Sequence, residues 1–575
     1  MIQYTKQNDT YKESETCWTI QLGFCLPKTC SNEEIMYLTQ RYFDENYLEL
    51  QKMYHMNMMV TNVKSLREDI FVIIIILVLL SIAGTIYDVR QHHREKNLIT
   101  SYYNQNPILN TKNPTTISTI ELVSKSSSEN LAQPNTFGDI LKCFSIYSNT
   151  KNLVKTKLSP DSVGCIHGLR FLGMLWVIAV HGIYFQADYI SNVPYAFRLS
   201  ENFAAQILSN STYCVDTYLF LSGFLVTYLY YKANKPQEKS ENPTNYLRKF
   251  IEFCMMYFNR FVRLTPPYLA ILLFADVIYT LLRQTSSLTS SEMPDVVCEK
   301  YWWRNLLYIN NLFPRKDMCL SWSWYLSLDT QFFTITTFLA ILSLTAFKVT
   351  AAVTFLLIFT GIGATIYKSY SIGYIPTLDE QLLQLDAIYD LPWNRIGPYL
   401  VGAITGYLLQ VHLQHKLALT KVQRIVLWVA FPLINLWILF TIYTRQLSVE
   451  LSALYMGVSR TLWGVGIAWI VVACCTGNAQ ALQKFLSFRG FIPLSRMTYC
   501  AYLLNPIVAT MLYLGSEQAF NSSLSGFGLT LSGVTLLTFF MSYVFCVLVE
   551  SPFILLTKMA FKKITRGKGA SEKKP

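Results

Sequence analysis

Residues 168–182 read GLRFLGMLWVIAVHG, an apolar run with one arginine near its start and one histidine near its end. In a helix, the step from Arg170 to His181 is about three turns, so both side chains lie on nearly the same face, about 16 Å apart along the axis. A polar side chain that touches lipid is costly, so this face is expected to point into a protein interior or a hydrated cavity. The stretch therefore predicts a membrane-spanning helix that carries a polar site. The alternative is that His181 packs between helices and Arg170 snorkels at the membrane edge.

The composition places the chain among membrane proteins. Of its 575 residues, 52% are hydrophobic and only 15% are charged, which is too apolar for a soluble globular protein. The formal charge of +12 is first explained by basic cytoplasmic loops, so no nucleic-acid partner is expected. The 13 cysteines lack the paired close spacing of a zinc site, so no metal centre is expected.

The apolar segments predict an all-α, polytopic integral membrane protein with about eleven transmembrane helices. Residues 70–87 form one N-terminal span, which basic residues follow on its cytoplasmic side. Ten further spans form a membrane domain over residues 165–555. They lie near residues 171, 214, 266, 324, 349, 396, 425, 456, 495 and 528. With an odd number of spans, the N-terminus is predicted to be lumenal or extracellular and the C-terminus cytoplasmic, in the endoplasmic reticulum or the plasma membrane.

Three polar segments flank these spans. Residues 1–69 form a lumenal or extracellular segment with three cysteines, which cannot all pair internally, and no signal peptide precedes it. This pattern is typical of a shortened chain. Residues 88–164 are rich in Ser, Asn and Thr and predict a flexible cytoplasmic linker with little fold. Residues 556–575 form a basic cytoplasmic tail.

The predicted outer segments carry sites for covalent modification. Glycosylation sequons stand at Asn8, Asn210 and Asn521. All three fall on the predicted lumenal side. The outer loop 284–322 contains Cys298 and Cys319, and its oxidising compartment permits a disulfide. We therefore predict this bridge.

Charged residues near the spans are candidate site residues. Arg260 and Arg263 precede a span whose entry carries two prolines, a position that suits a helix start. With Arg170 they would form a cationic patch suited to phosphate groups, although topology alone also explains arginines at a cytoplasmic rim. Asp329 enters a span, where a carboxylate costs about 3 kcal/mol unless it is paired or hydrated. It is a candidate partner for His181 or a counter-ion for an arginine.

Three further charges lie near predicted outer helix ends. Asp216 and Arg395 are candidate acceptor-site or structural residues, and Arg395 could equally anchor its helix at the interface. Arg460 is expected to snorkel. Among the seven histidines, only His181 is predicted to lie well inside a span, whereas His167 and most of the others fall in loops or near helix ends.

Several motifs resemble one family. Arg170 and His181 are similar to the R-x10-H pattern of the acyltransferase-3 family of membrane enzymes. Four further stretches resemble family segments, namely VDTYLFLSGFL (215–225), NRFVRLTPPYL (259–269), WNRIGPYLVGAITGYLL (393–409) and FIPLSRMTYCAYLLNP (491–506). Residues 17–35 and 301–333 resemble the nose resistant to fluoxetine branch, a metazoan subfamily. In related sequences a histidine often stands at the position of Asn505.

This resemblance implies a membrane-bound acyltransferase. It would move an acetyl or longer acyl group from acyl-CoA to a hydroxyl-bearing lipid, sugar or small-molecule acceptor. Neutral imidazole can accept a proton from an attacking alcohol, so His181 is the candidate general base. The three arginines would hold the donor phosphates. Acyl-CoA is then a co-substrate, no bound cofactor is expected, and membrane lipids are further partners.

Two alternatives stay open. The same helices could form a transporter or a lipid- and drug-uptake protein, with His181 and Asp329 as proton or substrate ligands. A receptor or scaffold would leave His181 dispensable. The sequence contains no convincing internal repeat of the kind that transporters often carry, which favours the enzyme.

Overall fold

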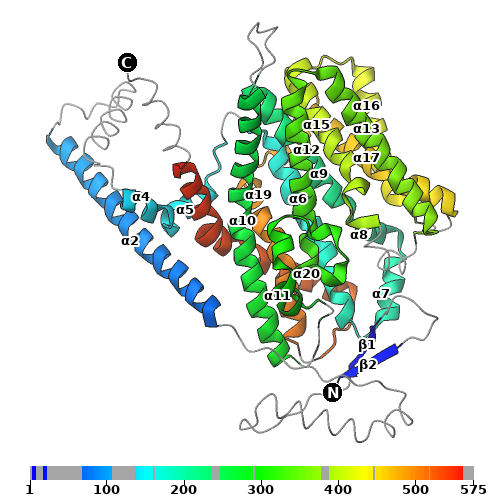
Figure 1. Cartoon of the computed structure of the whole chain (residues 1–575), viewed down its shortest axis with the longest axis horizontal. Coiled ribbons are helices and arrows are strands. Elements are labelled where there is room, and N and C mark those ends of the chain that lie inside the picture. Colours follow the sequence, from blue (N-terminus) through cyan, green and yellow to red (C-terminus); the bar gives the residue numbers. More distant parts are fainter. Residues whose placement is uncertain are drawn as a thin grey trace, which may run out of the picture.

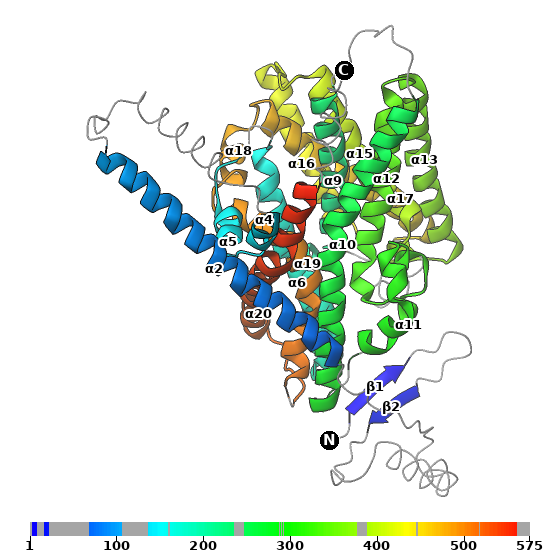
Figure 2. The same ribbon diagram turned by 60° about the vertical axis from the view of Figure 1, so that its left-hand side comes forward.

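The computed structural model describes residues 3–7, 17–21, 68–105, 136–158, 162–234, 246–286, 288, 290, 292–376, 388–443, 447–516 and 518–560. Long helices stand side by side in a bundle (Figure 1). Helix α11 (Pro294–Leu306) contains Cys298, which is disulfide-bonded to Cys319, and we call its end of the bundle the disulfide end. The opposite end, where Arg248 and Lys249 lie, is called the basic end. Helix α6 (Gly164–Gln186) and α10 (Tyr246–Thr285) both begin at the basic end (Figures 1 and 2).

The other long helices complete the bundle. They are α9 (Tyr213–Ala233), α12 (Trp324–Ser343), α13 (Phe347–Ser371), α15 (Ile396–Tyr407), α16 (Lys421–Phe440), α17 (Val449–Cys475), α19 (Phe491–Leu514) and α20 (Leu524–Phe545). Helices α15 and α20 continue directly into the π-helical turns η9 (Leu408–His412) and η10 (Cys546–Glu550). Short helices α7 (Val193–Ser200), α8 (Gln206–Ser209) and α18 (Gln480–Leu486) connect them.

Within the described residues, nine helical segments are long and apolar enough to cross a membrane. This confirms the prediction of an all-α polytopic membrane protein. Eleven spans were predicted, and the two that are absent from these nine segments correspond to α9 and α15. Several tyrosines and Asp216 lower the apolarity of α9, and α15 has only 12 residues before its π turn begins. Both helices are largely buried, so protein rather than lipid surrounds them. Outside the bundle, β1 (Gln3–Gln7) pairs antiparallel with β2 (Cys17–Gln21).

The two prolines of α10 differ from the prediction. Pro266 and Pro267 were expected where a span begins, but they lie inside a helix that starts at Tyr246. The basic, aromatic segment before them is helical as well, so α10 is 40 residues long. Proline removes a backbone donor, so the carbonyl oxygens of Val262 and Arg263 lose their usual helical partners.

Helices α9 and α15 approach each other closely because small residues face the contact. A methyl group added at Gly223 would overlap the carbonyl oxygen of Tyr399, and one added at Gly402 would overlap that of Phe220. Small residues let helix backbones approach in this way within membranes. The packing therefore places Asp216 and Ser222 of α9 beside residues of α15 and α12.

We expect Gly402→Ala to lower the free energy of unfolding by roughly 1–3 kcal/mol, because the new methyl group meets backbone atoms that cannot move aside. Thermal unfolding in detergent micelles measures the effect. Gly533→Ala on α20 is the matched control, since nothing lies within 4 Å of its added methyl group. Equal stability of the two variants would contradict close α9–α15 packing.

The predicted linker is partly folded, which corrects the expected boundary at residue 88. Helix α2 (Glu68–Gln105) runs beyond the predicted span, and α4 (Thr136–Cys143) and α5 (Ile146–Val154) lie between α2 and the bundle (Figure 1). The buried carboxylate of Asp88 accepts hydrogen bonds from the hydroxyls of Ser145 at 2.7 Å and Ser148 at 2.5 Å. These side chains satisfy the buried charge and dock α5 against α2.

Candidate active site

His181 lies on α6 and contacts α19. Its Nδ1 is 3.0 Å from Oδ1 of Asn505 on α19. The amide of Asn505 donates in turn to Oγ1 of Thr538 on α20, at 3.4 Å, which orients its carbonyl oxygen toward the histidine. A carbonyl oxygen only accepts hydrogen bonds, so Nδ1 carries the proton and Nε2 keeps its lone pair.

Aromatic rings surround the imidazole of His181. The ring of Phe185 stands edge-on at 5.8 Å between centroids, and that of Tyr502 is tilted at 6.2 Å. The hydroxyl of Tyr502 donates to the backbone oxygen of Trp322. The imidazole is half-buried, and no side chain within the described ranges bonds its Nε2. This nitrogen can therefore receive a proton from a bound hydroxyl group.

Arg170 and His181 both point from α6 toward α19, in agreement with the prediction that they share one face of their helix. The guanidinium of Arg170 donates to Oγ1 of Thr498 at 3.2 Å, so both residues bond to α19. A third bond of this kind joins His167 Nδ1 and the Ser495 hydroxyl at 2.5 Å. His167 was predicted to lie in a loop, but α6 begins before it, at Gly164. The polar residues of α19 recur at helical spacing, which is the signal that could have identified them.

Asp329 does not contact His181. Its carboxylate pairs with the guanidinium of Arg260 and accepts a hydrogen bond from the Ser222 hydroxyl at 2.5 Å. Arg260 also lies over the ring of Phe333, 4.4 Å from its centroid. Of the two roles left open by the sequence, the structure places Asp329 as a counter-ion for an arginine.

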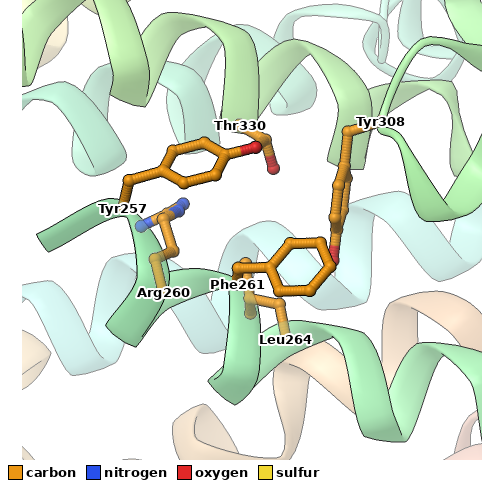
Figure 3. Close-up of a pocket in the computed structure, with 6 residues that line it drawn as sticks. All are labelled: Tyr257, Arg260, Phe261, Leu264, Tyr308 and Thr330. Atoms are coloured by element: carbon orange, nitrogen blue, oxygen red, sulfur yellow. The ribbon is translucent and has the colours of Figure 1, made fainter. Parts of the chain in front are cut away.

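A crevice opens beside Arg260 (Figure 3). It is lined by Tyr257, Arg260, Phe261, Leu264, Tyr308 and Thr330. The crevice is too narrow to admit a water molecule in this conformation. It therefore gives Arg260 no room for a second partner there.

Arg263 completes an arginine cluster with Arg170 and Arg260. The charged groups that act on Arg263 are Glu550 and these two arginines. Its side chain is exposed, and it makes no ion pair within the described residues. The structure therefore brings the three predicted donor-site arginines into one neighbourhood and leaves Arg263 accessible.

Asp216 and Arg395 form a fully buried ion pair. Arg395 donates to the carboxylate at 2.9 Å and to the backbone oxygen of Tyr389 at 2.8 Å. Both side chains are 0% exposed, so Arg395 does not anchor a helix at the interface. Arg460 is also buried and bonds backbone oxygens of Ile388 and Asn394, which corrects the expected snorkelling.

The loop at the disulfide end supplies charged residues that the sequence analysis missed. Arg315 pairs with Asp390 at 3.0 Å and donates to the hydroxyl of Tyr184 at 3.3 Å. Its charge also acts on His181, three residues before Tyr184 on α6. Nearby, Glu292 accepts a hydrogen bond from Ser321, and burial raises the pKa of the Glu292 carboxyl.

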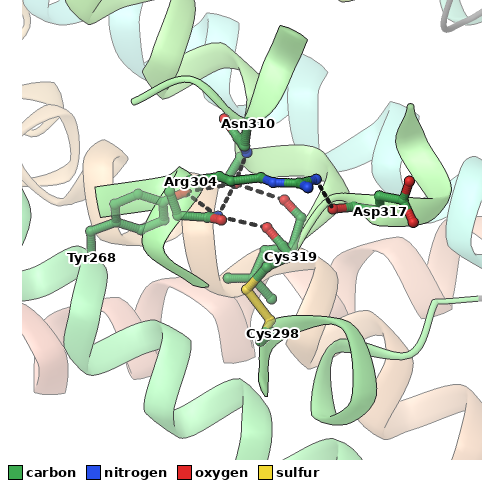
Figure 4. The surroundings of a disulfide bond; sticks show 9 residues. Tyr268, Cys298, Arg304, Asn310, Asp317 and Cys319 are labelled. Atoms are coloured by element: carbon green, nitrogen blue, oxygen red, sulfur yellow. Dashed lines mark hydrogen bonds between the residues drawn. A yellow bond between two sulfur atoms is a disulfide. The ribbon is translucent and has the colours of Figure 1, made fainter. Parts of the chain in front are cut away.

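A disulfide holds this loop. Cys298 of α11 and Cys319 are bonded, with their Cα atoms 4.5 Å apart, as the sequence predicted. Figure 4 shows the surrounding hydrogen bonds, including that from Arg304 to the backbone oxygen of Asp317 at 3.3 Å. The amide of Asn305 also donates to the backbone oxygen of Cys319 at 2.6 Å. These contacts fix the path of the segment that carries Arg315.

The three sequons have different surroundings. Asn8 lies outside the described residues. Asn210 is only 3% exposed, and its side-chain amide donates to the backbone oxygen of Leu439 at 2.7 Å. A glycan on that nitrogen is incompatible with this packing, which corrects the prediction at Asn210. Asn521 is exposed in the loop that precedes α20.

These features define a polytopic membrane protein with a polar, ion-paired interior and a histidine held between two helices. Residues 163–550 match the acyltransferase-3 family, which is described as an acyltransferase domain. This match spans more than half of the chain, so the protein belongs to the acyltransferase-3 family of membrane proteins. The family resemblance read from the sequence is thereby confirmed.

Two relatives come from Caenorhabditis elegans. Nose resistant to fluoxetine protein 6 is 29% identical over 412 residues, which cover 67% of this chain and 50% of that protein. Regulator of hypoxia-inducible factor 1 is 24% identical over 452 residues, covering 73% of this chain and 84% of that protein. The chain thus spans half the length of the first relative. No solved structure matches it.

Proposed function

We propose that this protein moves an acyl group from acyl-CoA to a hydroxyl group of a lipid, sugar or small-molecule acceptor. The hydrogen bond between His181 Nδ1 and Asn505 Oδ1 carries this proposal. It holds the imidazole in the tautomer whose Nε2 can act as a general base, and it orients the ring between α6 and α19. Asn505, at a position where related sequences often carry histidine, is a positioning residue.

The chemical step follows from this tautomer. His181 Nε2 accepts the proton of the acceptor hydroxyl as its oxygen attacks the thioester carbonyl. The carbon–oxygen bond forms, and the carbon–sulfur bond breaks. The leaving thiolate of coenzyme A then takes the proton back from the imidazolium. No covalent enzyme intermediate is needed, and the products are an ester and free coenzyme A.

The arginine cluster supports the choice of donor. Arg170 and the exposed Arg263 can bind phosphate oxygens, because guanidinium groups form paired, charge-assisted hydrogen bonds with phosphate. Arg260 is already paired with Asp329, so most of its charge is neutralised and it holds α10 against α12 beside the other two arginines. Arg170 and His181 share a face of α6, which would place the phosphates toward the basic end and the thioester toward the histidine.

We expect Arg263→Gln to raise the KM for acyl-CoA about tenfold or more with little change in kcat, because one charge-assisted bond to phosphate is lost. Steady-state release of coenzyme A measures both constants. Arg424→Gln, on exposed α16, is the control and should leave KM unchanged. Removing the 3′-phosphate from the donor should weaken binding to the native protein more than to the variant if Arg263 contacts that group.

The membrane orientation is part of the proposal. We place the basic end in the cytoplasm, where acyl-CoA is present, and the disulfide end in the lumen or outside the cell. The disulfide in the α11 loop and the exposed sequon at Asn521 support this orientation. The membrane would be that of the endoplasmic reticulum or the cell surface, with lipids as surrounding partners.

The test is turnover by the purified full-length protein in lipid nanodiscs. Release of coenzyme A is followed for a series of acyl-CoA donors, with and without a membrane extract that supplies acceptors. Acceptor-dependent release of coenzyme A is the expected result. If no donor is consumed, while the protein in vesicles moves lipids or drugs across the bilayer, the transporter alternative replaces the enzyme.

A further inference from the structure

Two thiols and a carboxylate converge at the end of α20. Cys500 of α19 and Cys546 of η10 are 0% and 2% exposed, and Glu550 at the end of η10 is 9% exposed. The sulfur atoms lie 3.3 and 3.1 Å from Oε2 of Glu550. Across the described part of the chain, this is the group of three potential metal ligands whose ligand atoms all lie within 4.8 Å of one another.

The local backbone brings these side chains together. Helix α20 changes into a π turn at Cys546, and this turn ends at Glu550. Cys546 and Glu550 are four residues apart, and both face Cys500 on the neighbouring helix. Single π turns within helices are rare and occur frequently at functional sites.

The charge of Glu550 is poorly satisfied by protein groups. Its hydrogen bonds within the described residues come from the two thiols, which are weak donors. It forms no ion pair there, although the charge of Arg263 acts from nearby. A buried carboxylate is costly unless it is paired or coordinates a metal. Two thiolates, one carboxylate and a divalent cation carry a net charge of −1, which Arg263 balances.

We propose that Cys500, Cys546 and Glu550 bind a zinc ion. Zinc takes thiolate and carboxylate ligands at about 2.3 and 2.1 Å in a tetrahedron, which separates a sulfur from an oxygen ligand by about 3.6 Å. The sulfur–oxygen distances of 3.3 and 3.1 Å need little adjustment to reach this value. Thiolates alone would also suit Cu(I), but the carboxylate favours zinc. The site has three protein ligands and a fourth position for a small molecule.

This zinc ion would crosslink α19 and η10 within the membrane domain. It joins α19, whose Tyr499 hydroxyl donates to the backbone oxygen of Leu264 at 2.7 Å, to the π turn η10 that follows α20. The zinc site and the proposed donor site share the charge of Arg263, but zinc content is measured without acyl transfer, so either proposal can fail without the other. The zinc proposal revises the expectation of no metal centre, which rested on spacing along the chain, because Cys500 and Cys546 belong to different helices.

Zinc content of the purified full-length protein tests the proposal. The protein, without a polyhistidine tag and in nanodiscs, is incubated with zinc, separated from free metal and measured by mass spectrometry. We expect about one zinc per chain for the native protein, and a loss of at least 90% for Cys500→Ser/Cys546→Ser. Cys474→Ser, which removes a buried free thiol elsewhere, is the matched control and should retain zinc.

Cobalt gives an independent measurement. Co²⁺ in the site should show a thiolate charge-transfer band that persists in Cys474→Ser and disappears in Cys500→Ser. Glu550→Gln keeps both thiols and the side-chain shape, so it serves if the serine variants do not fold, and it should weaken zinc binding at least tenfold. A native protein without zinc and without the cobalt band would overturn the proposal, as would zinc that persists in the double variant.

Discussion

Replacement of His181 by glutamine is expected to lower kcat for acyl transfer about 10³-fold, while the dissociation constant of the donor changes little. Glutamine occupies a similar volume and can still hydrogen-bond with Asn505, but it cannot accept the proton of an attacking hydroxyl group. Single-turnover release of coenzyme A in nanodiscs measures the rate. Binding of a thioether analogue of acyl-CoA measures donor affinity separately.

His167→Gln is the matched control for this experiment. His167 lies on the same helix as His181 and also bonds α19, through the hydroxyl of Ser495. If histidines of α6 only hold the two helices together, both substitutions should reduce activity to a similar extent. If His181 is the general base, His181→Gln should abolish turnover and His167→Gln should not. Equal losses would support the helix-packing interpretation of His181.

Replacement of Asp216 by asparagine is expected to destabilise the fold by about 3–5 kcal/mol, the typical cost of removing one partner of a buried ion pair. Arg395 would keep its full charge at 0% exposure, and Arg460 adds a second buried cation whose charge acts on the same carboxylate. Thermal unfolding in detergent micelles and the yield of folded protein report the loss. Glu201→Gln, which changes an exposed carboxylate just after α7, should stay within about 0.5 kcal/mol.

A double variant separates the ion pair from general sensitivity of this region. Asp216→Asn combined with Arg395→Gln removes one charge of each sign, so the destabilisation should be smaller than the sum of the two single effects. Destabilisation equal to that sum would show that the pair is not coupled. Such additivity would contradict the contact between Asp216 of α9 and Arg395, the residue before α15.

Partner choice was the main feature that the sequence left open. Asp329 could have served His181 or an arginine, and the structure pairs it with Arg260. His181 instead bonds Asn505, which the sequence comparison singled out only because related proteins often carry histidine there. Both outcomes depend on the rotation and depth at which separate helices pack, and neither quantity is encoded in a local run of residues.

The predictions that were wrong also depended on how distant helices pack. Arg460 and Asn210 were predicted at accessible outer positions, but both are buried against segments distant in sequence. The residues 88–164 were expected to lack structure because their composition is polar. Their helices α4 and α5 form where Asp88 of α2 supplies hydrogen-bond acceptors.

Local properties of the sequence were sufficient for the membrane class, most of the spans and the shared face of Arg170 and His181. Hydropathy and the helical repeat depend only on residues close together in the sequence, so both can be read without knowledge of the fold. The disulfide between Cys298 and Cys319 was also predictable, because both cysteines lie in the one segment that joins α10 to α12. The ion pairs, the His181–Asn505 bond and the Cys500, Cys546 and Glu550 group arise only when distant helices pack. Only the tertiary structure could decide them, because their geometry depends on contacts between helices.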